Sequence, residues 1–347
     1  MEIIRELPER LSLPGPVVTI GNFDGVHLGH QKIFRKVVEK AGEMEGTAAA
    51  ITFFPHPVRV LTPERGLKMI TTFEDKARLI AGTGISLLLP LTFTREFARI
   101  DPEAFIREIL VEKLGTRWVI VGHNYAFGKG KKGNTALLRR RGEKYGFGVS
   151  VVRHARVHGD IVSSSRIRSL ILRGRVCEAS TMLGRAYHME GTVVKGAGRG
   201  ASILHVPTAN IAPENELSPK EGVYAVRVTF VKGPETEGQG QESGVKGSGK
   251  DGSQILDPGP LTLDPVIYDG VANIGKNPTF GNEERSYEVH IFNLNRDLLG
   301  QRLRIHFIDR IREEKKFPGV EALRLGIMDD METAREILAR RTPLLFP

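Results

Sequence analysis

Residues 17–30, which read VVTIGNFDGVHLGH, have the pattern of a strand, a tight turn and the start of a helix. Four β-branched residues run into two glycines and an acidic turn, as at the end of a buried strand. Apolar residues then recur at helical spacing over residues 31–41, so His27 and His30 lie where a helix begins. Unpaired backbone N–H groups at a helix start favour a bound anion, and imidazoles add donors. This stretch therefore predicts a site for the phosphates of a nucleotide.

The spacing H-x-G-H after an apolar strand, preceded by G-x-F-D-G, is more specific than an incidental polar turn, which is the alternative. It resembles the motif of the nucleotidylyltransferase superfamily. The longer form GNFDGVHLGHQ resembles more narrowly the prokaryotic bifunctional riboflavin kinase/FAD synthetase family. The resemblance implies catalytic roles for His27 and His30. The nucleotide-binding residues that it implies in this motif are Gly21, Phe23, Asp24, Gly25 and Gly29.

Length and composition indicate a globular protein of two domains. The chain has 347 residues and a single cysteine, Cys177, which excludes an internal disulfide framework and a cysteine-based zinc site. The sequence has no run of eighteen apolar residues, and its charged first ten residues contain no apolar core. We therefore expect no membrane span and no signal peptide, and a cytoplasmic protein.

The formal net charge of +9 raises the alternative of nucleic-acid binding. Most basic residues are interleaved with acidic ones, and the exceptions are residues 129–132 and 139–141. Both runs lie in the first half of the chain, close to phosphate-suited motifs, so a polyanionic small molecule such as ATP accounts for them. We expect neither a nucleic-acid partner nor a membrane partner.

Residues 47–152 alternate short apolar runs with amphipathic segments, the pattern of a parallel sheet covered by crossover helices. Thr72 caps one predicted helix, which runs to about Ala81, and Asp101 opens another. The prediction is an α/β domain with a Rossmann-like, doubly wound parallel sheet. In such sheets ligands lie beyond the carboxyl ends of the strands. After the strand at 17–20, strands are predicted at residues 48–53, 86–89, 117–121 and 149–152.

Two further loops follow predicted strands. His56 lies between two prolines, which fix a turn and hold the imidazole outward. Asn124 precedes aromatic residues and a glycine- and lysine-rich loop, which suit a flat ligand with phosphates. The alternatives are a strand-ending turn and a solvated basic loop. The family has a similar F-x-P-H-P motif and usually Phe-Arg-Phe-Gly after the position of Asn124, so the resemblance implies ligand contacts at both loops, although Tyr125 and Ala126 depart from it.

Ser163, Ser164 and Ser165 precede Arg166 at the start of a predicted helix. Their hydroxyl, N–H and guanidinium groups can donate to phosphates, and a plain helix cap is the alternative. Apolar residues such as Ile167 face inward, whereas Arg166 cannot lie on that face. The run closely resembles the S-S-T/S-x-I-R motif of the superfamily, in which the arginine side neutralises charge developing during nucleotidyl transfer.

Four motifs in the family's order imply one reaction for the first half. A phosphate monoester attacks the α-phosphorus of ATP, and pyrophosphate leaves. Such catalysis rests on positioning and electrostatic stabilisation rather than on a covalent intermediate. By resemblance, His27 and His30 would hold the phosphates, and Ser164 and Arg166 would clamp the triphosphate from the other side. Mg²⁺ would be required.

The periodicity changes after residue 184, and we place a domain boundary there, between domains 1–184 and 185–347. Beyond it, five or six short segments alternate apolar and polar side chains, which predicts antiparallel strands. A small closed antiparallel β-barrel hides the edges of such strands. Residues 231–263 interrupt the pattern with a glycine-rich, polar stretch. We expect a mobile, inserted hairpin loop there, with a functional lid as the alternative.

A glycine-rich loop and the run P-T-A-N mark the start of the second domain's chemistry. The side-chain oxygens of Thr208 and Asn210 suit Mg²⁺ that carries ATP, and simple turn chemistry is the alternative. The riboflavin kinase family has the same P-T-A-N motif after such a loop. Its usual L-G-F before the proline reads LHV at residues 204–206, which loses a glycine where backbone approaches nucleotide. The nucleotide-binding residues predicted here are Gly198, Arg199 and Pro207.

Glu288 alternates with Val289 along a predicted strand, so it faces the other side of the barrel wall from the apolar residues. A carboxylate there can take the proton from a substrate hydroxyl, and an exposed strand glutamate is the alternative. The resemblance implies that Glu288 is the catalytic base of the kinase. Residues 310–317, which include Arg312, and the apolar stripe of residues 323–338 are similar to the family's flavin-side loop and closing helix.

The resemblance covers nearly the whole chain outside residues 231–263 and implies a bifunctional enzyme. The C-terminal domain would phosphorylate riboflavin with Mg·ATP to give FMN, and the N-terminal domain would adenylylate FMN to FAD. ATP, riboflavin, FMN and FAD are then the partners, with the flavins as substrates and products. Two alternatives stay open: only the adenylyltransferase is active, or a basic RNA-binding or regulatory module uses the same scaffold. The sequence predicts no particular oligomer.

Overall fold

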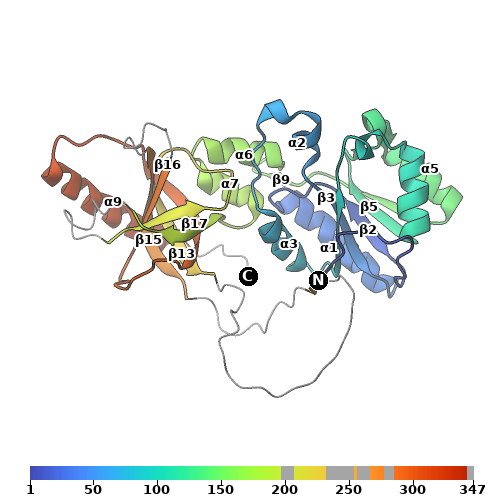
Figure 1. Ribbon diagram of the computed structural model, residues 1–347, viewed down its shortest axis with the longest axis horizontal. Coiled ribbons are helices and arrows are strands. Elements are labelled where there is room, and N and C mark those ends of the chain that lie inside the picture. The colour runs from blue at the N-terminus through green and yellow to red at the C-terminus, as the bar shows by residue number, and fades with distance from the viewer. Residues whose placement is uncertain (197–206, 232–253, 256–265, 277–284, 342–347) are drawn as a thin grey trace, which may run out of the picture. The chain divides into compact units, whose positions relative to one another are not determined.

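The computed structural model describes residues 1–196, 207–231, 254–255, 266–276 and 285–341. By their contacts, these residues divide into two compact units (Figure 1). The first unit contains Met1–Ser163 and strand β14 (Gln254–Ile255), and the second begins at Ser164. Helices α6 (Ser164–Leu172) and α7 (Val176–Leu183) therefore group with the second unit. The boundary that the sequence predicts near residue 185 stays a prediction.

The first unit is built on a sheet with strand order β14-β1-β4-β3-β2-β5-β8. Only the pairing of β14 with β1 is antiparallel among the described pairings of this sheet, so the predicted parallel sheet is confirmed. From β2 the chain passes to β3 and β4 on one side and later to β5 and β8 on the other. The sheet therefore has its switch point between β2 and β5, where ligands bind in this class of fold. The strands are β1 (Glu2–Ile3), β2 (Val17–Ile20), β3 (Ala48–Phe54), β4 (Leu87–Thr92), β5 (Trp118–Gly122) and β8 (Gly148–Val152).

Helices cover both faces of this sheet because right-handed crossovers that run in opposite directions place their helices on opposite faces. Figure 1 shows α1 (Leu28–Glu43) and α3 (Phe73–Ala81) on one side of β2, β3 and β5, with α5 (Thr135–Tyr145) on the other. Two predicted helix starts are confirmed by their caps. Thr72 accepts the N–H of Asp75 at 3.1 Å, and Asp101 accepts the N–H of Glu103 at 2.8 Å. Asp101 opens α4 (Pro102–Ala104), which continues as the π-helix η3 (Phe105–Lys113).

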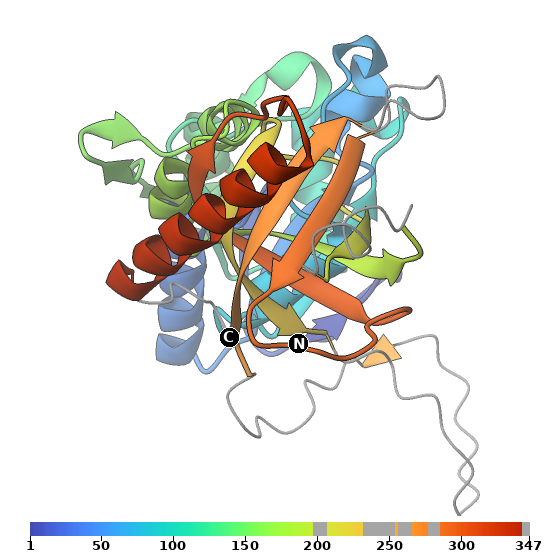
Figure 2. The same cartoon turned by 90° about the vertical axis from the view of Figure 1, so that its left-hand side faces the viewer.

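The second unit contains a closed barrel with strand order β11-β12-β16-β15-β13-β17, which confirms the predicted antiparallel barrel. The C-terminal helix α9 (Val320–Arg340) packs against β13, β15 and β17, and Figure 2 shows it lying across the barrel wall. The strands are β11 (Tyr187–Val194), β12 (Ala209–Pro213), β13 (Gly222–Phe230), β15 (Tyr268–Lys276), β16 (Arg285–Ile291) and β17 (Arg302–Arg312).

Strand β13 is buried on both faces, although its sequence alternates apolar and polar residues. The second face is buried because α9 covers it. Arg227 on this strand is only 6% exposed. Its guanidinium donates to the carbonyl oxygens of Leu338 at 2.9 Å and Arg341 at 2.8 Å, and to Asp269 Oδ1 at 3.2 Å. A buried charge with carbonyl acceptors thus joins the C-terminal end of α9 to the barrel.

We expect Arg227→Met to lower the free energy of unfolding of the second unit by about 2–4 kcal/mol, because the buried acceptors lose their donor. Urea unfolding followed by circular dichroism measures this change. The only tryptophan, Trp118, lies in β5, so its fluorescence reports the first unit as an internal control. Arg340→Met removes an exposed arginine that pairs with Glu336 at 3.2 Å. Equal effects of the two substitutions would contradict the anchoring role of Arg227.

Candidate functional sites

The turn between β2 and α1 has an unusual backbone. Phe23 and Val26 have φ angles of 51° and 40°, in the left-handed region. Their exposed fractions are 2% and 1%, so packing fixes both side chains. This conformation is costly for bulky and β-branched residues. Gly25, with φ of 79°, is in a conformation that L side chains rarely adopt, and a Cβ there would lie only 3.1 Å from the side chain of Ile70. The turn is therefore held in one shape, which delivers His27 to the start of α1.

His27 is the N-cap of α1, and its Nδ1 accepts the backbone N–H of His30 at 3.4 Å. A neutral imidazole that accepts at Nδ1 carries its proton on Nε2, so the outer nitrogen of His27 is a donor. The rings of His27 and His30 are stacked, with centroids 3.6 Å apart and an interplanar angle of 16°. A Cβ on Gly29 would lie 3.0 Å from Cε1 of His27, so glycine here leaves room for that ring.

His30 is in its neutral form at neutral pH. Burial, followed by the charges of His27 and Lys76, lowers the pKa of His30 well below its usual value. Its Nδ1 is buried and has no hydrogen-bond partner among the residues that the structure describes. The start of α1, the two imidazoles and the ammonium of Lys76 all favour negative charge. This end of the sheet can therefore bind an anion.

Asp24 ties the turn to the segment before α3. Its Oδ1 accepts the backbone N–H groups of Ile70 at 3.0 Å and Thr71 at 3.4 Å. Lys76 on α3 was not among the residues singled out from the sequence, although it lies three and four residues before the buried Leu79 and Ile80, on the same helix face. Burial lowers the pKa of Lys76 to about 8, against the opposing effect of Asp24.

The remaining residues predicted in this unit lie at the ends of strands. Gly21 donates its N–H to the carbonyl of Ile51 at 3.0 Å. His56 caps α2 (Pro57–Leu61), where its Nδ1 accepts the N–H of Val58 at 3.2 Å. Asn124 is exposed just after β5, the strand beside β2, so it follows the same edge of the sheet as the His27 turn.

The boundary between the two units falls within the serine run of residues 163–165. Ser163 ends the first unit, and Ser164 begins α6 in the second. Ser165 and Arg166 are exposed in the first turn of that helix. The predicted clamp role of Ser164 and Arg166, opposite the histidines, stays a prediction.

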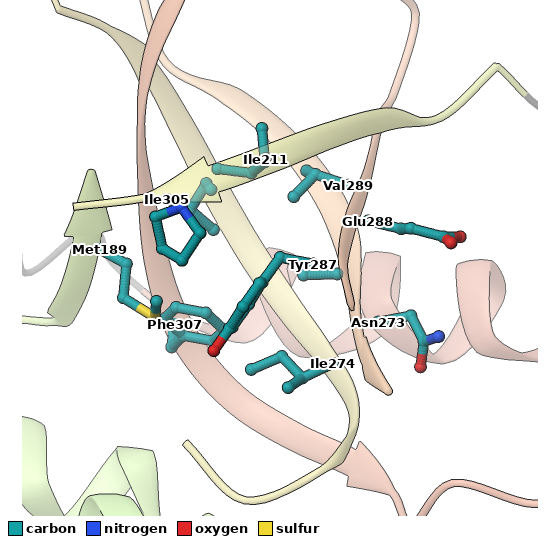
Figure 3. A pocket seen from close by; sticks show the side chains of 11 residues that line it. Met189, Ile211, Asn273, Ile274, Tyr287, Glu288, Val289, Ile305 and Phe307 are labelled. Atoms are coloured by element: carbon teal, nitrogen blue, oxygen red, sulfur yellow. The ribbon is translucent and has the colours of Figure 1, made fainter. Parts of the chain in front are cut away.

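Three polar residues form a row on adjacent barrel strands. Glu288 on β16 is the register partner of Asn210 on β12 and of Asn273 on β15. Direct partners share one face of a sheet. Figure 3 shows Glu288 and Asn273 directed to the same side, away from the apolar side chains of the barrel interior. The predicted alternation at Glu288 is therefore confirmed. The pocket in the barrel is lined by apolar residues that include Met189, Ile305 and Phe307, and Asn273 and Glu288 also belong to its lining.

The surroundings of Glu288 raise its pKa, as expected for a base that accepts a proton. Burial, followed by the nearby carboxylate of Glu314, raises the pKa of Glu288 above its usual value. Glu314 follows β17 and lies against β15, since a Cβ on Gly275 would clash with its carboxylate. The sequence alone could not distinguish Glu314 from Glu313, which pairs with Lys220 at 2.7 Å instead.

The P-T-A-N run offers a set of oxygen ligands beside this row. Thr208 is half-buried and leads into β12, where Asn210 follows two residues later. A ring nitrogen of His290 and the carbonyl of Pro207 lie 2.8 Å apart, which fixes the turn. A Cβ on Gly196 would clash with the amide of Asn210, so the backbone encloses that side chain closely. Hydroxyl, amide and carboxylate oxygens fit Mg²⁺. The predicted residues Gly198 and Arg199 lie outside the described residues.

Arg312 is joined to the C-terminal helix. Its guanidinium donates to both carboxylate oxygens of Asp330 on α9, each at 2.7 Å. Its guanidinium carbon also lies 5.5 Å from the ring centroid of Phe317. Arg312 thus fixes the start of the loop that carries Glu314, and its predicted contact with a ligand stays a prediction.

Comparisons with known proteins also divide the chain into two parts. The model of the FAD synthetase family matches residues 10–166, and that of the riboflavin kinase family matches residues 183–338. A bifunctional riboflavin kinase/FMN adenylyltransferase from Escherichia coli (strain K12) is 30% identical over 345 residues, 99% of this chain and 100% of the relative. Its counterpart from Listeria monocytogenes is 34% identical over 327 residues, 93% of each chain.

One solved structure is similar over almost the whole chain. It is titled a macrolide-efflux protein from Streptococcus pneumoniae, with a TM-score of 0.77, 28% identity, and coverage of 98% of this chain and 99% of the other. In the part of this chain that the structure describes, no helix combines the length and hydropathy needed to cross a membrane.

We expect Gly29→Ala to slow the conversion of FMN into FAD by about 10- to 100-fold, because the new Cβ displaces the ring of His27. The higher helix propensity of alanine offsets the weakened His27 cap, so thermal stability should change little. Gly42→Ala on the same helix is the matched control, because a Cβ at Gly42 meets nothing within 4 Å. Steady-state rates and thermal unfolding of both variants check this. An unchanged rate of FAD formation in Gly29→Ala would show that the position of the His27 ring does not matter for the reaction.

Proposed function

This chain belongs to the family of bifunctional riboflavin kinases/FMN adenylyltransferases, and on that premise we propose which of its residues carry each reaction. The protein is a transferase that phosphorylates riboflavin to FMN and then adenylylates FMN to FAD. Each half of the chain matches its own family model, which does not favour a single active domain or an RNA-binding module. The relatives are bacterial enzymes, and we propose a cytoplasmic location.

In the adenylyl transfer, a phosphate oxygen of FMN attacks the α-phosphorus of ATP. The bond from that phosphorus to the β-bridging oxygen breaks, and pyrophosphate leaves. We assign the triphosphate to the start of α1, where the first backbone N–H groups of the helix, the Nε2 donor of His27 and the ring of His30 converge. The observation that carries this assignment is the His27 cap at the carboxyl end of β2, beside the switch point of the sheet.

Further residues complete that site in this proposal. Asn124, after the neighbouring strand β5, contacts the acceptor side. The backbone of Gly21, Gly25 and Gly29 contacts the nucleotide, and His56 contacts it from the end of β3. Arg166, which is exposed in the first turn of α6, neutralises the charge that develops on the phosphates, and the hydroxyl of Ser164 donates to them.

In the kinase reaction, a riboflavin hydroxyl attacks the γ-phosphorus of ATP, and ADP leaves. We assign Glu288 as the base that takes the hydroxyl proton. Its pKa is raised by burial and by Glu314, which increases its affinity for that proton. Asn210 and Asn273 flank it on the neighbouring strands and orient the reacting groups. The row of these three side chains carries this assignment.

Thr208 and Asn210 would hold Mg²⁺ that enters with ATP, because Asn210 is the register partner of Glu288 and Thr208 precedes it by two residues. Bound there, the ion supplies charge neutralisation across the phosphates. The chain's own groups then position the hydroxyl and accept its proton. The partners that we propose are therefore Mg·ATP, riboflavin, FMN and FAD.

Two variants test the assignment of two sites. Glu288→Gln should slow FMN formation from riboflavin by about 100-fold or more, through loss of the base, and leave FAD formation from supplied FMN intact. His30→Ala should slow FAD formation by about 10- to 100-fold and leave FMN formation intact. Product separation after incubation with ATP, Mg²⁺ and either flavin measures both. Loss of both reactions in either variant would contradict separate sites.

The electrostatic role of Glu314 predicts a pH effect. The base must be deprotonated, so kcat/KM of the kinase reaction falls as pH drops through the raised pKa of Glu288. Glu314→Gln removes a neighbouring negative charge and lowers that pKa, so the acidic limb of the profile should move to lower pH. Glu313→Gln, at the exposed carboxylate that pairs with Lys220, should leave the limb in place. A limb that stays fixed or moves upward in Glu314→Gln would rule out this electrostatic role.

A further inference from the structure

Lys76 is a buried lysine in the first unit that none of the family motifs described above includes. Its side chain comes from α3 and is only 5% exposed. The ammonium Nζ donates to Oγ1 of Thr52 at 3.3 Å, and that hydroxyl donates to the carbonyl of Asn22 at 3.2 Å. Asn22 belongs to the strained turn before α1. Two hydrogen bonds therefore connect the Lys76 charge to the turn that carries His27.

The surroundings of Lys76 compensate its charge only in part. Thr52 is a neutral acceptor, and the carboxylate of Asp24 also accepts two backbone N–H groups. Although Asp24 raises the pKa of Lys76, burial outweighs it and leaves the value at about 8. The ammonium is thus mainly protonated at neutral pH, in an environment that disfavours its charge. A buried positive charge that is compensated only in part lowers the stability of the fold. Such a charge is typical of a site that binds an anion.

His30 indicates where that ligand binds. Thr52 links Lys76 to Asn22 in the turn that ends at His27, and the ring of His30 stacks on that of His27 with centroids 3.6 Å apart. The charge of Lys76 also contributes to the lowered pKa of His30. The buried Nδ1 of His30 has no hydrogen-bond partner among the described residues. A phosphate group between them would relieve both groups, since it accepts hydrogen bonds and brings negative charge.

We propose that Lys76 is a further catalytic residue of the adenylyl transfer, whose ammonium contacts the β- and γ-phosphates of ATP beside His30. When the FMN oxygen bonds to the α-phosphorus and the bond to the β-bridging oxygen breaks, negative charge accumulates on the departing pyrophosphate. The ammonium stabilises that charge without giving up its proton. This inference rests on the proposed place of the triphosphate at the start of α1.

The test compares Lys76→Met and Lys76→Arg with Lys36→Met, which removes an exposed lysine of α1. The forward reaction gives KM for ATP and FMN, and the reverse reaction of FAD with pyrophosphate gives KM for pyrophosphate. In Lys76→Met, we expect kcat/KM for ATP and for pyrophosphate to fall by about 10- to 100-fold, through a lower kcat together with a higher KM for these two ligands. KM for FMN should stay within about twofold. Lys76→Arg should recover part of the loss because it keeps the charge, and Lys36→Met should match the unaltered chain.

A purely structural role would reduce the fraction of active protein and leave each KM unchanged. Unchanged KM values for ATP and pyrophosphate in Lys76→Met would therefore overturn the proposal, as would an equal rise in KM for FMN. Riboflavin kinase activity of the same preparations and Trp118 fluorescence report whether each variant is folded. If the unaltered chain makes no FAD from FMN and ATP, the proposed function fails together with this inference. If it does and Lys76→Met matches it, only this inference fails.

Discussion

The buried turn that ends with His27 as the cap of α1 is the constraint on which the first unit's chemistry depends. Phe23 and Val26 hold left-handed conformations that cost about 1–3 kcal/mol each, and the packed core around them maintains the strain. The turn places the first backbone N–H groups of α1, two stacked imidazoles and Lys76 in one environment. Asp24 compensates the charge of Lys76 only in part, and His30 stays neutral at neutral pH. A triphosphate supplies negative charge to this environment. The strained turn is therefore what positions the groups that bind it.

The second unit solves phosphate chemistry in a different way. Its reactive groups lie on neighbouring strands of a closed barrel, where register fixes Glu288 between Asn210 and Asn273. The negative charge of Glu314 and partial burial tune the base. Arg227 and Arg312 anchor α9 to the barrel through buried or bidentate hydrogen bonds. The first unit is therefore suited to hold a departing polyanion, and the second to accept a proton.

Local signals made most of the fold predictable, whereas charges brought together by tertiary packing were not. The turn after β2, the caps at Thr72 and Asp101 and the barrel strands follow from periodicity and capping chemistry within a few residues. Strands β1 and β14 span two residues each, too few for a periodic pattern. Lys76 and Glu314 acquire their importance from Asp24, His30 and Glu288, which are distant in sequence. The polar face of β13 is buried because α9 covers it, which strand alternation cannot reveal.

The position of the ATP phosphates in the first unit tests the central claim most directly. A crystal structure of the full chain with a non-hydrolysable ATP analogue would measure it. We predict phosphate oxygens at about 3 Å from Nε2 of His27, from backbone N–H groups in the first turn of α1 and from Nζ of Lys76. Phosphates bound elsewhere in that unit, with the start of α1 in contact with solvent alone, would contradict the assignment.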